Sequence, residues 1–373
     1  FLTFVLKHLT MNIAIVCGAR PNLMKVAPII RAIRNNKHFG GVNYQLIYTG
    51  TEDDPSLEPS LFNDLEISRP DVYLGVDCEN LNELTGQVMS KFELYLQQHP
   101  TDVVIVVDDL ASTMAAAIVA KKQGIKLAHI AAGTRSFDIS MPKEINRLVI
   151  DGLSDILFTA GISNNNIANK EGAELSKVYM VGNILIDNLR YNHGRLKRPA
   201  ILDKLGLDDH RYLVFTLNRK ALIENKAHLS ELIRAIIGGL KDATFPIIAP
   251  LRGKAAAVVK EILAETSYPS VITLVPPQSY LDFGYITAHA AGIITDSGNV
   301  AEEATFNQVP CITLNSYTEH IETVKVGTNV LVGEDPELLC TYVSEMIAGR
   351  WKAAGIPDRW DGRSAERILQ ILC

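Results

Sequence analysis

Cysteine is scarce in this sequence, and no cysteine spacing typical of a disulfide framework or a zinc site occurs. The 373 residues include five scattered cysteines without a CxxC pair: Cys17, Cys78, Cys311, Cys340 and Cys373. Their odd number and scatter favour a reducing compartment. No His, Asp and Glu group shows metal-ligand spacing either. We therefore expect a cytoplasmic protein without a structural metal.

Long apolar runs and an excess of basic charge are also missing. The apolar start, FLTFVLKHLT, is ten residues long, which is too short to span a bilayer. We expect residues 1–10 to be an N-terminal extension, native or added, and we expect no membrane insertion. The formal net charge of −6 argues against a basic face for nucleic acid.

The sequence contains no glycine-rich nucleotide-binding motif. It does contain apolar strands that alternate with helical patterns. The glycine pairs fit neither a P-loop nor a dinucleotide motif. Strands are expected at residues 13–17, 43–50, 103–107 and 126–130, with helices between them. The second half repeats the alternation through RYLVFTLN, FPIIAPL, SVITLVPP and GIIT. This pattern favours an α/β fold with doubly wound, Rossmann-like parallel sheets.

The length suits two such domains of roughly 150–180 residues each. A helical, then basic and proline-containing stretch begins at VGNILID and indicates the connection between them. We expect domains at residues 11–183 and 184–357, followed by a C-terminal helical segment, 358–373. In such sheets ligands sit at the carboxyl ends of the strands, so we expect the site in a cleft between the domains.

Charged residues follow two of the expected strands in the first half. Arg20 comes directly after the first strand, and Lys25 lies one helical turn on. Such cations can meet a base carbonyl or a phosphate. Asp108 and Asp109 follow the apolar strand 103–107. One of them can cap the alanine-rich helix, and the other can act as a general acid or base.

TDSGNVAEEA, at residues 295–304, is the strongest local signal. Ser297 and Gly298 at a strand-to-helix turn would offer backbone N–H groups and a helix dipole to a diphosphate. Glu302 and Glu303, one turn along, could accept ribose hydroxyl hydrogens. The competing interpretation is plain N-capping by Asp296 or Ser297.

Aromatic and histidine residues give weaker signals. Tyr280 or Phe283 could stack on a nucleobase, although aromatic residues at this spacing are usually core residues. His129 and His320 are single histidines, which are more often satisfied by a neighbour than catalytic.

Taken together, these motifs resemble the hydrolysing UDP-N-acetylglucosamine 2-epimerase family, whose architecture is GT-B. The resemblance runs from Met11 to the C-terminus. CGARPNLMKVAP is similar to GTRPE-x-x-K-x-AP, HIAAGTRS to H-x-EAG-x-R, and MPKEINR to PEE-x-NR. TDSGNVAEEA is similar to TDSG-x-x-EEA, and YTEHIET to T-x-ERPE. The order of several spaced motifs makes the resemblance specific.

The resemblance implies a UDP-sugar ligand, no other cofactor, a homodimer, and a last helix that packs back on the first domain. Arg20 and Phe283 would hold the uracil, Ser297 and Gly298 the diphosphate, and Glu303 the ribose. Cleft closure would pivot near residues 182–187. We also place Lys25 at the nucleotide. The candidate sugar or acceptor pocket consists of Arg135, Arg147, Asn218, Arg219, Arg252 and His320.

The sugar end departs from the family pattern. Asp109 matches the family's catalytic Asp, and Glu144 keeps the second Glu of PEE. Ala131, Lys143 and Asn218 replace two Glu and a His that the family uses. Other departures are Asp108 for Gly, His320 for Arg, Arg252 for His, and Thr51-Glu52 for Gln-His. Losing one acid–base group typically costs about 10²–10⁴ in rate.

Three functions remain open on these residues. The first is C2 epimerisation of a UDP-N-acetylhexosamine or a modified sugar, for example a carboxylated one, with Asp109, Asp108 or Lys143 transferring protons. The second is glycosyl transfer from a UDP-sugar to an anionic acceptor, with Asp109 or Asp108 as base. The third is nucleotide-sugar binding without turnover. Surface-polysaccharide biosynthesis is the pathway class that the family suggests.

Overall fold

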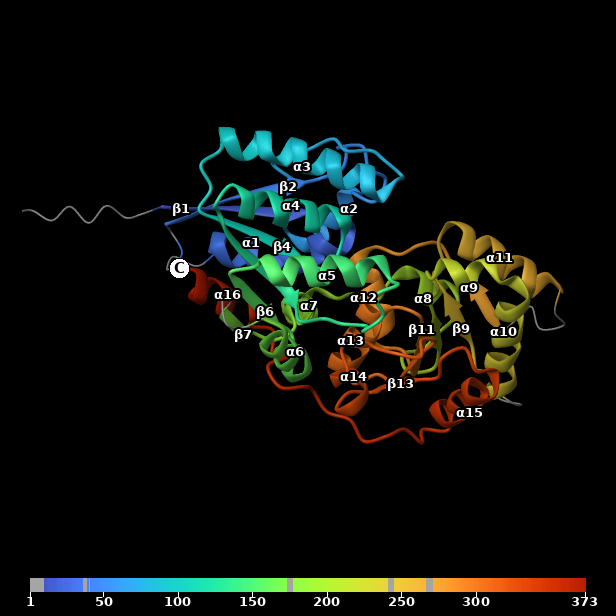
Figure 1. Ribbon diagram of the computed structural model, residues 1–373. Coiled ribbons are helices and arrows are strands. Elements are labelled where there is room, and N and C mark those ends of the chain that lie inside the picture. The colour runs from blue at the N-terminus through green and yellow to red at the C-terminus, as the bar shows by residue number, and fades with distance from the viewer. Residues whose placement is uncertain (1–9, 36–38, 40, 173–176, 241–244, 266–270) are drawn as a thin grey trace, which may run out of the picture. The chain divides into compact units, whose positions relative to one another are not determined.

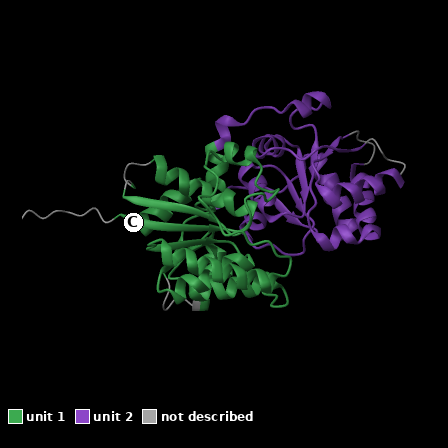
Figure 2. Cartoon of the chain, turned by 90° about the horizontal axis from the view of Figure 1, so that it is seen from above, with its two compact units in different colours: residues 1–191, 358–373 green, residues 192–357 purple. Residues whose placement is uncertain are grey.

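The chain forms two compact units. The computed structural model describes residues 10–35, 39, 41–172, 177–240, 245–265 and 271–373, so the expected extension lies outside the described residues except for Thr10. Unit 1 comprises Phe1–Tyr191 and Asp358–Cys373, and unit 2 comprises Asn192–Pro357 (Figure 2). Among the described residues, no helix combines the length and the apolar character needed to cross a membrane.

Unit 1 contains a seven-stranded parallel sheet in the order β3-β2-β1-β4-β5-β6-β7 (Figure 1). β4 lies at its centre and reads VVIVV, and all five side chains are buried because helices cover both faces. The strands are β1 (Met11–Cys17), β2 (Val42–Tyr48), β3 (Val72–Tyr73), β4 (Val103–Val107), β5 (Lys126–Ala132), β6 (Ile156–Thr159) and β7 (Lys177–Met180).

The helices of unit 1 form two layers. α3, α4 and α5 pack side by side on one face, and α1 packs against α16. Asn80 caps α3 by accepting the backbone N–H groups of Asn82 and Glu83. The helices are α1 (Arg20–Asn35), α2 (Pro59–Leu65), α3 (Leu81–Gln98), α4 (Ala111–Lys122), α5 (Pro142–Leu153), α6 (Ile162–Gly172), α7 (Ile184–Asn192) and α16 (Ser364–Leu372).

Unit 2 contains a six-stranded parallel sheet in the order β10-β9-β8-β11-β12-β13. Its strands are β8 (Leu213–Phe215), β9 (Ile247–Ala249), β10 (Ile272–Leu274), β11 (Gly292–Thr295), β12 (Cys311–Thr313) and β13 (Asn329–Leu331). Its helices are η2 (His193–Arg195), α8 (Ala200–Lys204), α9 (Lys220–Glu224), α10 (Lys226–Leu240), α11 (Gly253–Glu265), α12 (Tyr280–Ala288), α13 (Gly298–Asn307), α14 (Glu322–Lys325) and α15 (Pro336–Ile347). The expected class, two doubly wound parallel-sheet domains, is confirmed.

α7 belongs to unit 1 up to Tyr191, past the boundary expected at residue 183. Its side chains hold it there: Arg31 Nη2 donates to Asn188 Oδ1 at 2.6 Å, and the Asp187 carboxylate accepts the N–H groups of Ser364 and Ala365 at 3.1 and 2.8 Å. Asp187 therefore caps α16 from another helix. The sequence pattern could not show this, because the cap and the capped helix lie far apart in the chain.

Gly182, the start of the expected pivot, is fixed by a close contact. Its φ is +101°, and a Cβ there would lie 2.1 Å from the Arg359 carbonyl oxygen. Only glycine fits both the backbone conformation and this contact. Residues 182–187 thus join α7 and the returning C-terminal segment into one packed element of unit 1.

The strand orders place one topological switch point in each unit. In unit 1, β1 has β2 on one side and β4 on the other; in unit 2, β8 lies likewise between β9 and β11. Ligands of open α/β sheets bind beside the carboxyl ends of strands at such points. The loops that follow β1, β4, β8 and β11 carry most of the residues singled out by the sequence.

Candidate active site

At the switch point of unit 1, the loop after β1 approaches the loop after β4 closely. Gly18 permits this, since a Cβ there would lie 2.1 Å from Ser112 Oγ on α4. Asn22 joins the loops: its Oδ1 accepts the Gly18 N–H at 3.0 Å, and its Nδ2 donates to Asp108 Oδ2 at 3.0 Å. Asn22 was not singled out by the sequence, although it lies within the CGARPNLMK motif.

Asp108 is locked in place by its carboxylate. Lys25 Nζ lies 2.6 Å from Oδ1, with the Lys25 side chain 9% exposed, while Asn22 occupies Oδ2. Burial alone would raise the pKa of Asp108, but Lys25 and Asn22 outweigh it and hold that pKa below its usual range. Both oxygens are engaged, so Asp108 is suited to positioning rather than to proton transfer.

Asp109 is held differently. Arg147 Nε and Nη2 both contact Oδ2, at 2.8 and 2.6 Å, and Lys143 Nζ lies 3.4 Å from Oδ1. Asn146 Nδ2 donates to the Asp109 backbone carbonyl at 2.8 Å. Neither aspartate caps the following helix, because Leu110 is the N-cap of α4. The structure thus brings together the predicted residues Asp109, Lys143 and Arg147.

Glu144 is buried and saturated by donors. Its Oε2 accepts the Ser136 N–H at 2.9 Å and contacts Arg147 Nη1 at 3.1 Å, and its Oε1 accepts the Phe137 N–H at 3.0 Å. Burial opposes ionisation, but these donors keep the pKa of Glu144 below its usual value. Glu144 therefore links the β5–α5 loop to α5 and helps to hold the Arg147 guanidinium in place.

The last residues of β5 have unusual backbone geometry. Ala131 has a φ of +66°, and the register between β5 and β6 shifts between Ile130 and Ala132. Its methyl group replaces the carboxylate that the family motif would put there, so position 131 offers no proton-transferring side chain. Arg135, predicted for the sugar pocket, is instead buried and paired with Asp151 at 2.8 Å and Glu171 at 2.5 Å.

Arg20 and Lys143, two further predicted cations of unit 1, differ in how far they are exposed to solvent. Arg20 is the first residue of α1, directly after the loop that follows β1, and it is half-buried. Lys143, in the first turn of α5, has a side chain that is 58% exposed. Lys143 is therefore the cation of this loop cluster that solvent or a ligand reaches most easily.

At the switch point of unit 2, Asp296 organises the loop after β8. Its Oδ2 accepts the backbone N–H groups of Asn218 and Arg219 at 2.7 and 2.6 Å. The Arg219 side chain turns toward Asn315 and Glu334. Asp296 therefore does not cap α13, which removes one of the two capping interpretations and gives Asp296 a positioning role that the sequence did not suggest.

The N-terminus of α13 has no side-chain cap, although the Ser297 N–H itself donates to Thr295 Oγ1 at 3.0 Å. Ser297 is its N-cap, but the Ser297 side chain makes no capping hydrogen bond. No acidic residue lies in the first turn, and a Cβ added at Gly298 would meet nothing within 4 Å. Backbone N–H groups and the helix dipole at such an end attract phosphate.

Glu302 and Glu303 follow on α13 and are both buried. Burial, together with the neighbouring Glu302, raises the pKa of Glu303 to about 8. His320 Nε2 lies 3.4 Å from Glu302 Oε1, so His320 meets a carboxylate, as expected for a single buried histidine. Glu303 is thus a largely protonated carboxyl group at neutral pH, close to the anion-attracting end of the helix.

The remaining predicted residues of unit 2 lie on separate elements. Phe283 is on α12, partly buried against an apolar cluster that includes Ile286 and Val300. Arg252 and Asn218 are exposed in the loops after β9 and β8. Phe283 can present at most one edge or face to a base, because its other side packs in the core.

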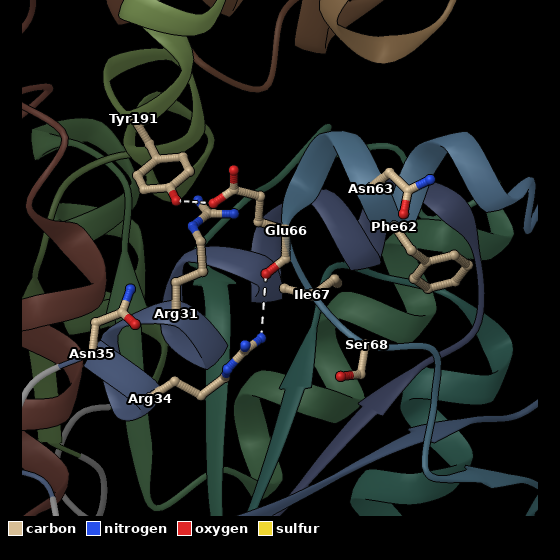
Figure 3. Close-up of a pocket in the computed structure, with 9 residues that line it drawn as sticks. All are labelled: Arg31, Arg34, Asn35, Phe62, Asn63, Glu66, Ile67, Ser68 and Tyr191. Carbon is tan, nitrogen blue, oxygen red and sulfur yellow. Dashed lines mark hydrogen bonds between the residues drawn. The ribbon is translucent and has the colours of Figure 1, made fainter.

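One pocket of unit 1 lies apart from all predicted site residues (Figure 3). It measures about 480 Å³ and is lined by α1, α2 and the end of α7. Tyr191 donates its phenol hydrogen to Glu66, Arg31 stacks on the Tyr191 ring at 4.1 Å, and Arg34 Nη1 donates to the Glu66 carbonyl at 3.4 Å. These contacts anchor the last residue of unit 1 before the chain enters unit 2.

Comparison with known proteins settles the family. The model of the UDP-N-acetylglucosamine 2-epimerase family matches residues 31–373. The chain belongs to this family. A UDP-N-acetylglucosamine 2-epimerase of Methanocaldococcus jannaschii is 33% identical over 371 residues, covering 97% of this chain and 99% of that protein.

Similar proteins include an epimerase named for another UDP-sugar, a solved epimerase structure and a protein that shares only the fold. A UDP-2,3-diacetamido-2,3-dideoxy-D-glucuronate 2-epimerase of Pseudomonas aeruginosa is 29% identical over 333 residues, covering 88% of this chain and 90% of that protein. The crystal structure of the Methanocaldococcus jannaschii UDP-GlcNAc 2-epimerase in complex with UDP-GlcNAc and UDP has a TM-score of 0.84 at 32% identity, covering 97% and 99% of the two chains. A glycosyltransferase of Rickettsia africae, at 12% identity and a TM-score of 0.57, shares the fold alone.

Proposed function

We propose that this protein is an enzyme that epimerises C2 of a UDP-N-acetylhexosamine or a modified derivative of one. Membership of the 2-epimerase family supports this, as do the names of the similar proteins. The observation that carries the proposal is the placement of Asp109. It follows a buried central strand at a switch point, with Oδ2 held by Arg147 and Oδ1 3.4 Å from the exposed Lys143.

UDP is assigned to unit 2. The α13 N-terminus, with Ser297 and Gly298, would hold the diphosphate, and Glu303 would accept the ribose hydroxyl hydrogens. Phe283 would contact the uracil with its accessible side. Arg20 and Lys25 of unit 1 remain the other candidates for the nucleotide, although Lys25 is already paired with Asp108.

The reaction then needs one proton removed and one returned. Asp109 Oδ1 would take the C2 proton while the C2–H electron pair forms a C1=C2 double bond and UDP leaves with the C1–O pair. Addition of UDP to C1 and of a proton to the other face of C2 gives the epimer. Lys143, 3.4 Å from Asp109, is our candidate for the second transfer, and Asp108 has a positioning role.

A carboxylated sugar is the variant of this substrate that Lys143 favours. An exposed ammonium replaces a family glutamate at this position, which makes the sugar end more cationic. The Pseudomonas aeruginosa relative named above is a glucuronate 2-epimerase. Arg252, also exposed, would be the second cation for such a group.

Glycosyl transfer is the second candidate, and the methyl group of Ala131 favours it. Transfer needs no C2 proton chemistry, so it would tolerate the missing carboxylate at position 131. Asp109 would then deprotonate an acceptor hydroxyl, and Lys143 would hold an anionic acceptor.

An NMR time course in D₂O separates these functions. UDP-N-acetylglucosamine, its 2,3-diacetamido analogue and the corresponding UDP-uronates would each be incubated with the protein. Deuterium at C2, together with the C2 epimer, is the result that we expect. If a UDP-sugar binds but C2 keeps its proton and UDP stays attached, epimerisation is refuted. UDP release only on addition of an acceptor would then establish transfer.

A further inference from the structure

A buried histidine links the loops on which the candidate catalytic residues lie. His129, on β5, is 2% exposed. Its Nδ1 lies 2.6 Å from Asp151 Oδ1 on α5, and its Nε2 lies 3.0 Å from the backbone carbonyl oxygen of Asp108 after β4. One imidazole ring therefore touches both segments that meet at Asp109.

Both partners of this ring are acceptors. A carbonyl oxygen has no proton to give, so His129 Nε2 must donate to it. Asp151 is ionised: burial opposes this, but the Arg135 guanidinium at 2.8 Å and the Gly133 N–H at 3.0 Å stabilise the carboxylate independently of the ring, and the pKa of Asp151 lies below its usual value. Nδ1 must therefore donate too. Both bonds exist together only when the ring carries two protons, that is, as an imidazolium.

The bond to Asp108 acts on a strained residue. Asp108 has a φ of +59°, a left-handed conformation that residues other than glycine adopt only at an energetic cost. The family motif has glycine here, which needs no such support. In this chain Lys25 and Asn22 hold the Asp108 side chain, while His129 holds its carbonyl. The next peptide unit leads directly to Asp109.

Charged groups from several elements surround the His129 ring and its two partners. Asp151 also accepts the Gly133 N–H at 3.0 Å and pairs with Arg135 at 2.8 Å, and Arg135 pairs with Glu171 on α6. Lys25 on α1 pairs with the Asp108 carboxylate at 2.6 Å. A change in the charge of His129 would therefore alter the electrostatic interactions of three segments: the end of β4, the β5–α5 loop and α5.

We propose that His129 is a positioning residue that acts as an imidazolium clamp. It fixes the carbonyl of the left-handed Asp108 to Asp151 and thereby sets the direction of the Asp109 carboxylate. When the ring loses a proton, one of its two bonds becomes impossible, and the Asp108–Asp109 peptide is released. The consequence for turnover rests on the proposed role of Asp109, whereas the clamp itself does not.

NMR of the full chain with ¹⁵N-labelled histidine tests the clamp without substrate. The His129 signals, assigned by their loss in His129→Gln, should show that both ring nitrogens are protonated under the assay conditions. In His129→Gln the backbone amide of Asp109 should shift, because the bond that holds the Asp108 carbonyl is altered. His99→Gln is the control and should leave that amide unmoved, because His99 Nδ1 bonds the carbonyl of Tyr95 on the distant helix α3. A neutral His129 ring, or an Asp109 amide that does not move in His129→Gln, would overturn the proposal.

Kinetics supply the second readout. His129→Gln should lower kcat about 10²-fold, because a small misplacement of a reacting group costs this much, while KM changes little. His99→Gln should leave both kcat and KM unchanged. An unchanged kcat in His129→Gln refutes the clamp. If the NMR results support the clamp but the protein shows no epimerisation, the proposed function is refuted and the clamp is not.

Discussion

Arg147 places two nitrogens, Nε and Nη2, on the same oxygen of Asp109, at 2.8 and 2.6 Å, and leaves Oδ1 to Lys143 at 3.4 Å. The carboxylate is thus divided into one fixed oxygen and one reachable oxygen. Charge-assisted bonds from a buried guanidinium fix geometry strongly, whereas an exposed lysine contributes little to stability. Such a division suits a group that must keep its orientation while one oxygen exchanges a proton.

Replacing Asp109 by Asn should therefore remove the proton acceptor and keep the shape. We expect Asp109→Asn to lower kcat for the C2 exchange by about 10²–10⁴-fold, the usual cost of losing a general acid or base. Asp102→Asn is the matched control at the other end of the same strand, where Asp102 Oδ2 accepts the Asn12 N–H at 2.8 Å. Deuterium incorporation at C2 is the measurement. Equal rates in the two variants would remove Asp109 from the mechanism.

The Lys25–Asp108 pair should be strongly coupled. Asn tolerates the left-handed backbone of Asp108, so Asp108→Asn removes the charge without new strain. Loss of one partner of a buried pair typically costs about 3–5 kcal/mol, and because the Asp108 side chain is 18% exposed we expect a value at or below the lower end of this range from urea unfolding. Adding Lys25→Met should recover part of that loss. Additive effects in the double-mutant cycle would show that the 2.6 Å contact carries no coupling energy.

UDP binding should release a proton from Glu303. Burial and Glu302 raise the pKa of Glu303 to about 8, so the free protein holds this proton at pH 7. Ribose hydroxyl groups that donate to the carboxylate favour its ionised form and expel the proton. Calorimetry in HEPES and Tris should give different apparent enthalpies at pH 7 and nearly equal ones at pH 9. Glu303→Gln should remove the buffer dependence. Identical enthalpies for the unmodified protein at pH 7 would contradict the ribose assignment.

The cap on α16 should make stability depend on pH. Burial raises the pKa of Asp187 from 3.8 to about 6, despite the N–H groups of Ala365 and Ser364. A group whose pKa is higher in the folded state stabilises the protein below its unfolded pKa, and this contribution is lost as pH rises. Between pH 4 and 7 the free energy of unfolding should lose up to about 3 kcal/mol through this group.

Asp187→Asn tests that dependence, because its amide oxygen can still accept both N–H groups but does not titrate. The difference in the free energy of unfolding between the original protein and the variant should therefore shrink or reverse from pH 4 to pH 7. Asp102→Asn serves again as the control. A difference that stays constant with pH would show that Asp187 does not titrate in this window.

Local sequence patterns determined the central architecture. VVIVV predicted a buried strand of a sheet covered on both faces, and the last helix, implied by the family resemblance, is formed by Ser364–Leu372. The edge strands β3 and β7, with two and four residues, and the four-residue β6 beside β7 carry too few residues for a pattern and were missed. The family motifs, which are also local, indicated the family that the comparisons then established.

Tertiary structure alone decided which charged residues meet. In the sequence Asp108 and Asp109 are equivalent neighbours after one strand, but the left-handed backbone of Asp108 turns it to Lys25 on α1, while Asp109 meets Arg147 on α5. Likewise, Asp187 caps a helix that lies far along the chain. Periodicity reports which face of its own element a residue occupies. The partner of a charge depends on how distant elements pack, and no local pattern encodes that.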